Sequence, residues 1–206
     1  MPRFAAVSLL TVLLFFAMRF AGAEQTDNHV LRAVPVPGPV TVDGRLSEWD
    51  LSGRIFICPN LAYQDDASAW VAMMYDAQAL YVGVDWTDKT PMVNNYDPRT
   101  MVDQRFAFHS DSLQLHFKTD MLRNVFGWYF TKGKMPGAYA MNGLIGFHEK
   151  EIVYLDADAL GITQGFQLKP DGKGYVQEMR IPWTAIVKSG RAYGPGESFG
   201  CMLDLV

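Results

Sequence analysis

Cysteine and histidine are scarce in this chain of 206 residues, which contains two cysteines and four histidines. The histidines are His29, His109, His116 and His148. None of them has the i, i+4 helical spacing of a zinc motif, and none has a cysteine beside it. The common zinc motifs are therefore excluded. C-x-x-C-H is also absent, which excludes covalent attachment of a c-type haem.

The two cysteines, Cys58 and Cys201, leave two interpretations open. In an exported chain an even pair favours a disulfide, which here would close a loop of about 140 residues and contribute up to about 4–5 kcal/mol. Both residues also lie in apolar runs, "RIFICPN" and "FGCMLDLV", which is typical of two buried free thiols.

Positive charge is in short supply, because 18 Lys and Arg residues face 22 Asp and Glu residues, for a formal net charge of −4. No basic cluster exceeds two adjacent residues. Proteins that bind nucleic acid or anionic membranes present a basic face. We therefore expect neither partner.

Long hydrophobic runs are absent except at the N-terminus, where "FAAVSLLTVLLFFAM" follows Arg3. This run has about fifteen residues, fewer than the roughly 20 needed to span a bilayer, and Arg19 interrupts it. Ala21, Gly22 and Ala23 then offer the small residues that signal peptidase requires. Residues 1–23 are predicted to be a cleaved signal peptide rather than a membrane anchor, with the mature chain in the periplasm or outside the cell.

The rest of the chain divides into a lead-in and one domain. Residues 24–39 are Pro-rich ("RAVPVPGPV") and predicted to be extended. Residues 40–206 have the size and the 49% hydrophobic content of a single globular domain. The last residues, "ESFGCMLDLV", are typical of a strand that enters a core, so we expect a truncated domain and further domains beyond Val206.

Strand patterns fill the domain, and no helical periodicity is sustained over twelve residues. "AWVAMMYDAQALYVGVDW" predicts a hairpin whose loop spans 76–79, with Trp86 buried at the end of an apolar stripe. "DSLQLHFKTD" alternates between apolar and polar residues. "PWTAIVKSG" predicts one short helix or turn. The fold class is all-β: a two-sheet antiparallel, jelly-roll-like sandwich of about eight to eleven strands.

Three patterns that carry catalysis or metal binding in other proteins give little support for either here. "GESFG" fits G-x-S-x-G, but no histidine follows it. "DADALG" opens like a calcium loop but has Gln167 where a bidentate glutamate is required. Carboxylates for glycoside hydrolysis could come from Asp85, Asp88, Asp111 or Glu178, but their separation is not set by the sequence. We expect a protein that is not an enzyme.

Aromatic residues are abundant, at 13% of the chain with five tryptophans. Aromatic faces stack on the apolar faces of sugars while nearby polar groups fix the orientation of the ligand. Trp128 and Tyr129 are adjacent in a predicted strand, so one of them should face outward. The predicted carbohydrate-binding residues are Trp70, Trp128 or Tyr129, and the polar strand face of Gln114, His116 and Lys118.

"VTVDGRLSEW", "YDAQALYVGVDWTD", "HSDSLQLHF", "GYVQEMRIPWTAI" and "GESFGCMLDL", in this order, resemble the motifs of the family 9 carbohydrate-binding-module-like domain. The resemblance runs from about Val40 to the end of the chain. It implies a β-sandwich in which Asp43-Gly44 forms a tight turn and Trp49 caps one end. It also implies a sugar-binding module of a larger exported protein. Some members of that branch carry a structural calcium, and the candidates for such a site in this chain are Asp85, Asp88 and Asp111.

A related branch of that superfamily comprises haem-binding subunits of ethylbenzene-dehydrogenase-like enzymes, which hold haem b with Met and Lys ligands. The middle of this chain is longer than in the sugar-binding branch, and it contains Lys134, Met135 and Met141. Three hypotheses result: a non-catalytic domain that binds a glycan or polysaccharide without a cofactor, a haem b electron-transfer domain, and a scaffold domain without a small ligand.

Overall fold

The computed structural model describes residues 24–100, 107, 109–142 and 153–206, and these residues form mainly β-strands. The predicted signal peptide lies outside the described residues, as does His148. The strands are β1 (Ala33–Pro35), β2 (Ile55–Ile57), β3 (Ala67–Tyr75), β4 (Ala79–Asp88), β5 (Leu113–Lys118), β6 (Leu122–Phe130), β7 (Met135–Asn142), β8 (Val153–Asp156), β9 (Thr163–Leu168), β10 (Gly174–Pro182) and β11 (Gly200–Leu205). The helices are short, a 3-10 turn η1 (Leu61–Tyr63) and α2 (Trp183–Ile186).

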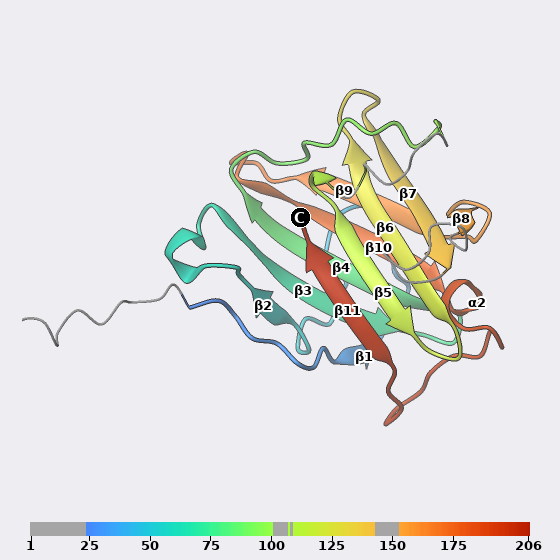
Figure 1. The fold of residues 1–206 in the computed structure, drawn as a ribbon. Helices are drawn as coiled ribbons and strands as arrows, with labels where there is room; N and C mark the ends of the chain where they lie inside the picture. Colours follow the sequence, from blue (N-terminus) through green and yellow to red (C-terminus); the bar gives the residue numbers. More distant parts are fainter. Residues whose placement is uncertain (1–23, 101–106, 108, 143–152) are drawn as a thin grey trace, which may run out of the picture.

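The strands form two sheets that face each other (Figure 1). The six-stranded sheet has the order β1-β3-β4-β10-β9, and β2 also pairs with β3. The five-stranded sheet has the order β11-β5-β6-β7-β8. The pairing of β1 with β3 is parallel, and the other strand pairs are antiparallel. The predicted all-β sandwich is confirmed.

The β3–β4 hairpin forms where the sequence predicts it, and Asp76 holds its turn. The Asp76 Oδ1 atom accepts hydrogen bonds from the backbone N–H groups of Gln78 at 2.7 Å and Ala79 at 2.8 Å. The Tyr81 hydroxyl donates to Asp76 Oδ2 at 2.9 Å. An aspartate that caps its own turn in this way fixes the register of the two strands, so that Tyr75 lies opposite Leu80.

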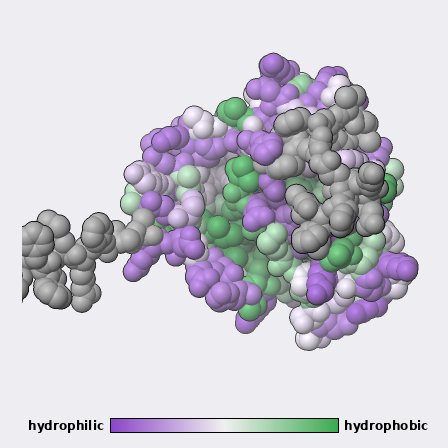
Figure 2. All heavy atoms as spheres, in the orientation of Figure 1, coloured by the Kyte–Doolittle hydropathy of each residue, from purple (hydrophilic) through white to green (hydrophobic). Residues whose placement is uncertain are grey.

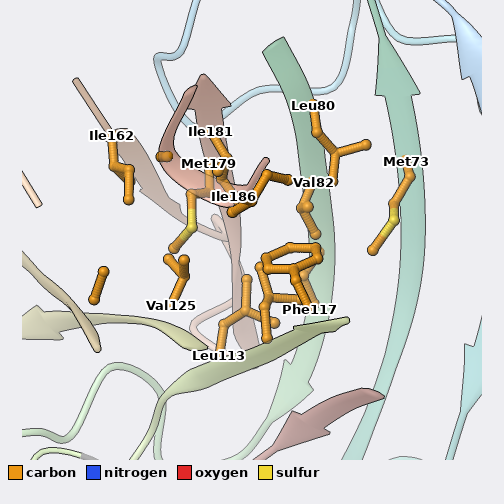
Figure 3. Packing of buried hydrophobic residues seen from close by; sticks show 14 of the residues in the cluster. Met73, Leu80, Val82, Leu113, Phe117, Val125, Ile162, Met179, Ile181 and Ile186 are labelled. Carbon is orange, nitrogen blue, oxygen red and sulfur yellow. The ribbon is translucent and has the colours of Figure 1, made fainter. Parts of the chain in front are cut away.

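The main core lies between the sheets and is built by alternation (Figure 3). Val82 and Met73 point inward from the six-stranded sheet, while Leu113 and Phe117 point toward them from the five-stranded sheet. Trp86 is 6% exposed and stacks on Tyr175 at 5.3 Å, which confirms that it is buried.

Each sheet also carries an apolar cluster on its outer face, away from the main core. On the five-stranded sheet this second cluster contains Ala107, Phe126, Trp128, Phe130, Tyr139 and Met141. On the six-stranded sheet it contains Trp49, Ala72, Met74, Ala79 and Tyr81. Because of these clusters, a side chain that points outward from a sheet can still be buried.

Residues 40–51, hereafter the clasp, are anchored by the buried carboxylate of Glu178 on β10. The Glu178 Oε2 atom accepts hydrogen bonds from the backbone N–H groups of Asp43, Gly44 and Arg45 at 2.8, 2.6 and 3.1 Å. Its Oε1 atom accepts from Trp49 Nε1 at 2.6 Å. Gly44 has φ +85° and lies against the backbone of β9, so a side chain there would collide with β9.

The position of Trp49 differs from the prediction that its indole caps one end of the sandwich. Its ring packs in the outer cluster of the six-stranded sheet, directly over Gly83. The reason is that Glu178 and Gly83 are register partners whose side-chain positions face outward, so the indole N–H must approach from that face.

Both cysteines are free thiols in the structure, so the disulfide interpretation is wrong for this fold. Cys58 is buried, with its Sγ atom 3.7 Å from the carbonyl oxygen of Ala67. Cys201 is exposed on β11 and is therefore not one of a buried pair. Within the described residues, no helix is both long and apolar enough to cross a membrane.

Candidate functional site

Trp70 differs from the other tryptophans because its side chain lies at the surface. Its exposed fraction is 40%, whereas those of Trp49, Trp86, Trp128 and Trp183 are 8% or less. Along β3 the neighbours of Trp70, Ala69 and Val71, point into the main core, so Trp70 points outward. The clasp covers the outer face further along the same sheet and leaves Trp70 uncovered.

The strand register places Trp70 in a row that crosses five strands. The members of this row, from β2 to β9, are Phe56, Trp70, Asp85, Val176 and Gln167. Arg54 and Lys169 lie beside the row at its two ends. We refer to these seven residues as the Trp70 surface.

One half of the Trp70 surface is aromatic. The Phe56 and Trp70 rings lie 5.1 Å apart between centroids, with 45° between their planes. The Cζ atom of Arg54 lies 4.5 Å from the centroid of the Trp70 ring, a cation–π distance. Because Arg54 is itself exposed, its guanidinium can move aside and leave the indole face to a ligand.

The other half of the Trp70 surface is polar. Asp85, which is directly opposite Trp70, pairs with Lys169 through a 2.7 Å contact between its Oδ1 atom and the lysine Nζ atom. Gln167 is exposed at the end of the row. Hydrogen-bond donors and acceptors thus lie next to an aromatic face. This arrangement suits the binding of a ligand that has both an apolar face and hydroxyl groups.

The predicted polar face of β5 alternates as expected but is largely covered. Gln114 is 6% exposed. His116 packs edge-on against Phe126 at 5.8 Å, and its Nδ1 atom lies 2.7 Å from Asn124 Oδ1. The Nε2 atom of His116 is 3.3 Å from Asp204 Oδ2. Of the predicted residues on this face, only Lys118 is exposed.

Trp128 and Tyr129 do face opposite sides of β6, but neither ring is exposed to solvent as a stacking surface. Trp128 points away from the main core and is still 1% exposed, because it packs in the second cluster and donates its Nε1–H to the Tyr96 carbonyl at 3.0 Å. Tyr129 points inward and contacts Phe166 at 5.5 Å. Strand alternation predicts correctly that the two rings point in opposite directions. It does not show that other segments of the chain, such as the one containing Tyr96, cover the outer face of the five-stranded sheet.

The three residues suggested as haem ligands lie on β7 and in the turn just before it. Lys134 is exposed, with φ 51°, in the turn before that strand. Met135 and Met141 begin and nearly end the strand, which at about 3.4 Å per residue separates them by roughly 20 Å. Axial ligands must lie on opposite faces of one iron atom, so Met141 cannot share an iron with either of the other two.

The acidic residues also fall into separate environments. Asp85 is paired with Lys169 in the Trp70 surface. Asp88 and Asp111 lie close together, and burial together with the Asp88 charge raises the pKa of Asp111 to about 6. Both carboxylate oxygens of Glu178 accept hydrogen bonds from the clasp. In the part of the chain that the structure describes, no group of three or more metal-binding side chains could hold a metal ion. Burial raises the pKa of Glu178, while its donors oppose the shift.

Sequence reasoning identified Trp70 but missed Phe56, Arg54 and Lys169. The run "RIFIC" alternates, and this pattern could have placed Arg54 and Phe56 on one face of a strand. The pairing of Phe56 with Trp70 depends on the register between β2 and β3. Lys169 reaches Asp85 only because β9, β10 and β4 are neighbours in space, and local patterns do not reveal this.

No family model matches this chain, and no curated protein matches it. Among solved structures, a protein from Bacteroides uniformis ATCC 8492 with the provisional name of carbohydrate-binding protein matches with a TM-score of 0.52 and 11% identity. The match covers 83% of this chain and 79% of that one. It shows that this chain shares the fold of that protein, and at this identity the likeness concerns the fold alone.

Two further matches are structures of a family 9 carbohydrate-binding module from Caldicellulosiruptor kristjanssonii. One is in complex with cellotriose, at 18% identity and a TM-score of 0.41 over 73% of this chain and 66% of that one. The other is in complex with glucose, at 19% identity and a TM-score of 0.40 over 73% of this chain and 68% of that one.

Proposed function

We propose that this chain is an exported, non-catalytic domain that binds a glycan or polysaccharide, and that the ligand lies on the Trp70 surface. A pyranose ring presents an apolar face of C–H groups and a rim of hydroxyl groups. Trp70 and Phe56 offer the apolar contact. Asp85, Lys169 and Gln167 offer acceptors and donors to the rim.

One observation carries the proposal: Trp70 is 40% exposed and lies between Phe56 and Asp85 in a row that is aromatic at one end and polar at the other. A large indole is costly to leave in contact with water, and the surface around it is not needed for the core. The shared fold with the Bacteroides protein, whose provisional name is carbohydrate-binding protein, is consistent with this function.

Export is part of the proposal and depends on the N-terminal sequence. The apolar run after Arg3 and the small residues before Glu24 are those of a cleaved signal peptide. Glycans and polysaccharides are the ligands that a domain in the periplasm or outside the cell would meet. Intact-mass analysis of the protein secreted by a bacterial host tests this step, and we expect a mature N-terminus at Glu24.

A glycan screen followed by titration calorimetry tests the binding function. We expect at least one oligosaccharide to bind the wild-type protein. Trp70→Ala should weaken that binding at least about tenfold, because truncating a tryptophan at the centre of a binding surface typically costs about 2 kcal/mol or more. Asp85→Asn should weaken binding less and should alter the preference among sugars.

Tyr63→Ala is the matched control, because Tyr63 is a 61% exposed aromatic residue on η1, outside the Trp70 surface. It should bind like the wild type. A sugar that binds Trp70→Ala and wild type equally would contradict the site, while the absence of any binding across the screen would contradict the function.

A further inference from the structure

The Trp70 surface lies on the outer face of the six-stranded sheet, on the far side of the molecule in Figure 1, where the five-stranded sheet is nearer the viewer. Figure 2 is drawn from the same side and shows the opposite face, on which hydrophobic residues gather where Figure 1 places β1, β2 and β11. Residues 40–100 and 153–182 form the Trp70 surface and its surroundings on the sheet, and the structure describes them throughout. The shape of this surface therefore limits which glycans fit on it.

The row in the Trp70 surface is longer than a single sugar ring. It runs from Phe56 to Gln167 over five neighbouring strands. At about 4.8 Å between strands, its length is about 19 Å. Val176 gives the row a further apolar position, because this half-buried side chain faces outward two strands away from Trp70, with Asp85 between them. Apolar contacts are thus offered on both sides of Asp85.

The clasp stops a ligand from extending along the strands on one side of the row. The next outward-facing positions on that side are Ala72, Gly83, Glu178 and Gly165. Trp49 packs over Gly83, and the clasp donates its hydrogen bonds to Glu178. Gly165 lies so close to the clasp that an added Cβ would be 2.6 Å from the backbone nitrogen of Gly44. A ligand that contacts both Trp70 and Gln167 must therefore lie across the strands.

The twist of the sheet turns the row into a curved surface. Adjacent strands are rotated by roughly 20–25°, so the outward direction turns by roughly 80–100° over the four steps from Phe56 to Gln167. A single flexible chain can follow this turn. The flat face of a crystalline polysaccharide would contact only one or two positions of the row at a time.

Both ends of the row lie level with the sheet. At the β2 end, Asn28 Nδ2 donates to the Phe56 carbonyl at 2.8 Å, and Thr26 N donates to the Cys58 carbonyl at 3.0 Å. Residues 26–28 therefore run beside β2 instead of standing over Phe56. At the β9 end, the Gln167 side chain is exposed. A chain that follows the row can continue past both ends.

We propose, on the basis of the function proposed above, that the ligand is a single linear polysaccharide chain. The Trp70 surface binds several consecutive units within that chain, across the strands from β2 to β9. Sugar rings pack on Trp70 and on Val176, and the hydroxyl groups between them bond to Asp85 and Lys169. All of these contacts come from one side of the chain, so recognition does not need a chain end.

Calorimetric titration with oligosaccharides of increasing length tests this inference. The probes are linear glucan, xylan, mannan and galactan fragments of one to six units, each also prepared with its reducing end converted to the alditol. In the series that binds, we expect the affinity to rise by about tenfold or more from two units to six, because each added ring covers more of the row. The six-unit alditol should bind as tightly as the unreduced fragment.

Gln167→Ala gives a second readout at the far end of the row. It should weaken binding of the six-unit fragment several-fold more than binding of the two-unit fragment, whereas Trp70→Ala should weaken both. Gln78→Ala is the matched control, because Gln78 is exposed in the turn between β3 and β4, away from the row. Thermal melts should show both glutamine variants folded, since both side chains are exposed.

Four results would overturn the inference and leave the proposed function in place. One is an affinity that stays constant from one unit to six, and another is loss of binding by the alditol, which would indicate a site for a chain end. A third is an equal effect of Gln167→Ala on short and long fragments. The fourth is binding of a branched glycan from the screen but of none of the linear fragments. Absence of binding by every glycan would instead contradict the proposed function itself.

Discussion

At the scale of single residues, Glu178 explains why the "TVDGRLSEWD" segment has its composition. A carboxylate with four N–H donors requires a tight turn that points three backbone N–H groups at one atom, and Asp43-Gly44 forms it. It also requires an indole N–H, which Trp49 donates. The sequence pattern predicts the turn and the tryptophan. It does not predict their partner, which is more than a hundred residues away along the chain.

Glu178→Gln should lower the free energy of unfolding by about 2–3 kcal/mol, because hydrogen bonds to a buried charge are strong and the amide NH2 group would face N–H donors. Urea unfolding followed by tryptophan fluorescence measures the loss. Glu48→Gln is the control, since Glu48 accepts one backbone hydrogen bond from Thr41 at an exposed position. Equal losses for the two variants would contradict the role of Glu178.

Asp111 predicts how stability depends on pH. Burial, with the nearby Asp88 charge, raises its folded-state pKa to about 6 from the ordinary 3.8. The folded state then holds this proton at pH values where the unfolded state has released it. Its contribution to stability is therefore full below about pH 4 and is lost as the pH rises to about 6.

Asp111→Asn should remove this part of the pH dependence, and Asp88→Asn should reduce it by removing the neighbouring charge. Denaturant midpoints measured between pH 4 and 7 give the slopes, and Asp65→Asn at an exposed position is the control. If the Asp111→Asn variant kept the wild-type slope, the carboxyl would not titrate as described.

At the scale of strands and sheets, the local sequence pattern predicts the strands and the direction of their side chains. The burial of those side chains is determined by the packing of segments that are distant in the sequence. The hairpin of β3 and β4 follows from alternation around Asp76. The β5 alternation is also correct, yet Gln114 and His116 are not open to solvent. Alternation says which way a side chain points, while coverage depends on segments that arrive from elsewhere in the chain.

The contact between the clasp and β9 can be tested with glycine substitutions. A Cβ atom at Gly165 would lie 2.6 Å from the backbone nitrogen of Gly44, so Gly165→Ala should push the clasp away from the sheet. We expect a loss of about 1–3 kcal/mol, the usual range for overpacking. In thermal melts, Gly38→Ala should be close to neutral, because nothing lies within 4 Å of its added Cβ. Similar melting temperatures for both variants would contradict this packing.

At the scale of the whole molecule, fold and function must be argued separately. The sandwich is used for many purposes, so the shared fold alone does not assign a ligand. The proposal of a glycan ligand rests here on the difference between two outer faces. The outer face of the five-stranded sheet buries Trp128 and Tyr139, whereas the six-stranded sheet leaves Trp70 beside Asp85 and Lys169. Both Trp70 and Trp128 are predicted from the sequence as binding residues, and local strand patterns do not separate them.

The indole N–H signals of the five tryptophans provide the most direct test of the Trp70 surface. Four of the indoles donate to partners inside the protein: Trp49 to Glu178, Trp86 to Gln177, Trp128 to Tyr96 and Trp183 to Asp76. In a nitrogen–proton correlation spectrum recorded during titration with an oligosaccharide selected by the screen, the Trp70 signal should shift and the other four should stay in place. A shift of the Trp128 signal with an unchanged Trp70 signal would contradict the account and place the ligand on the opposite sheet.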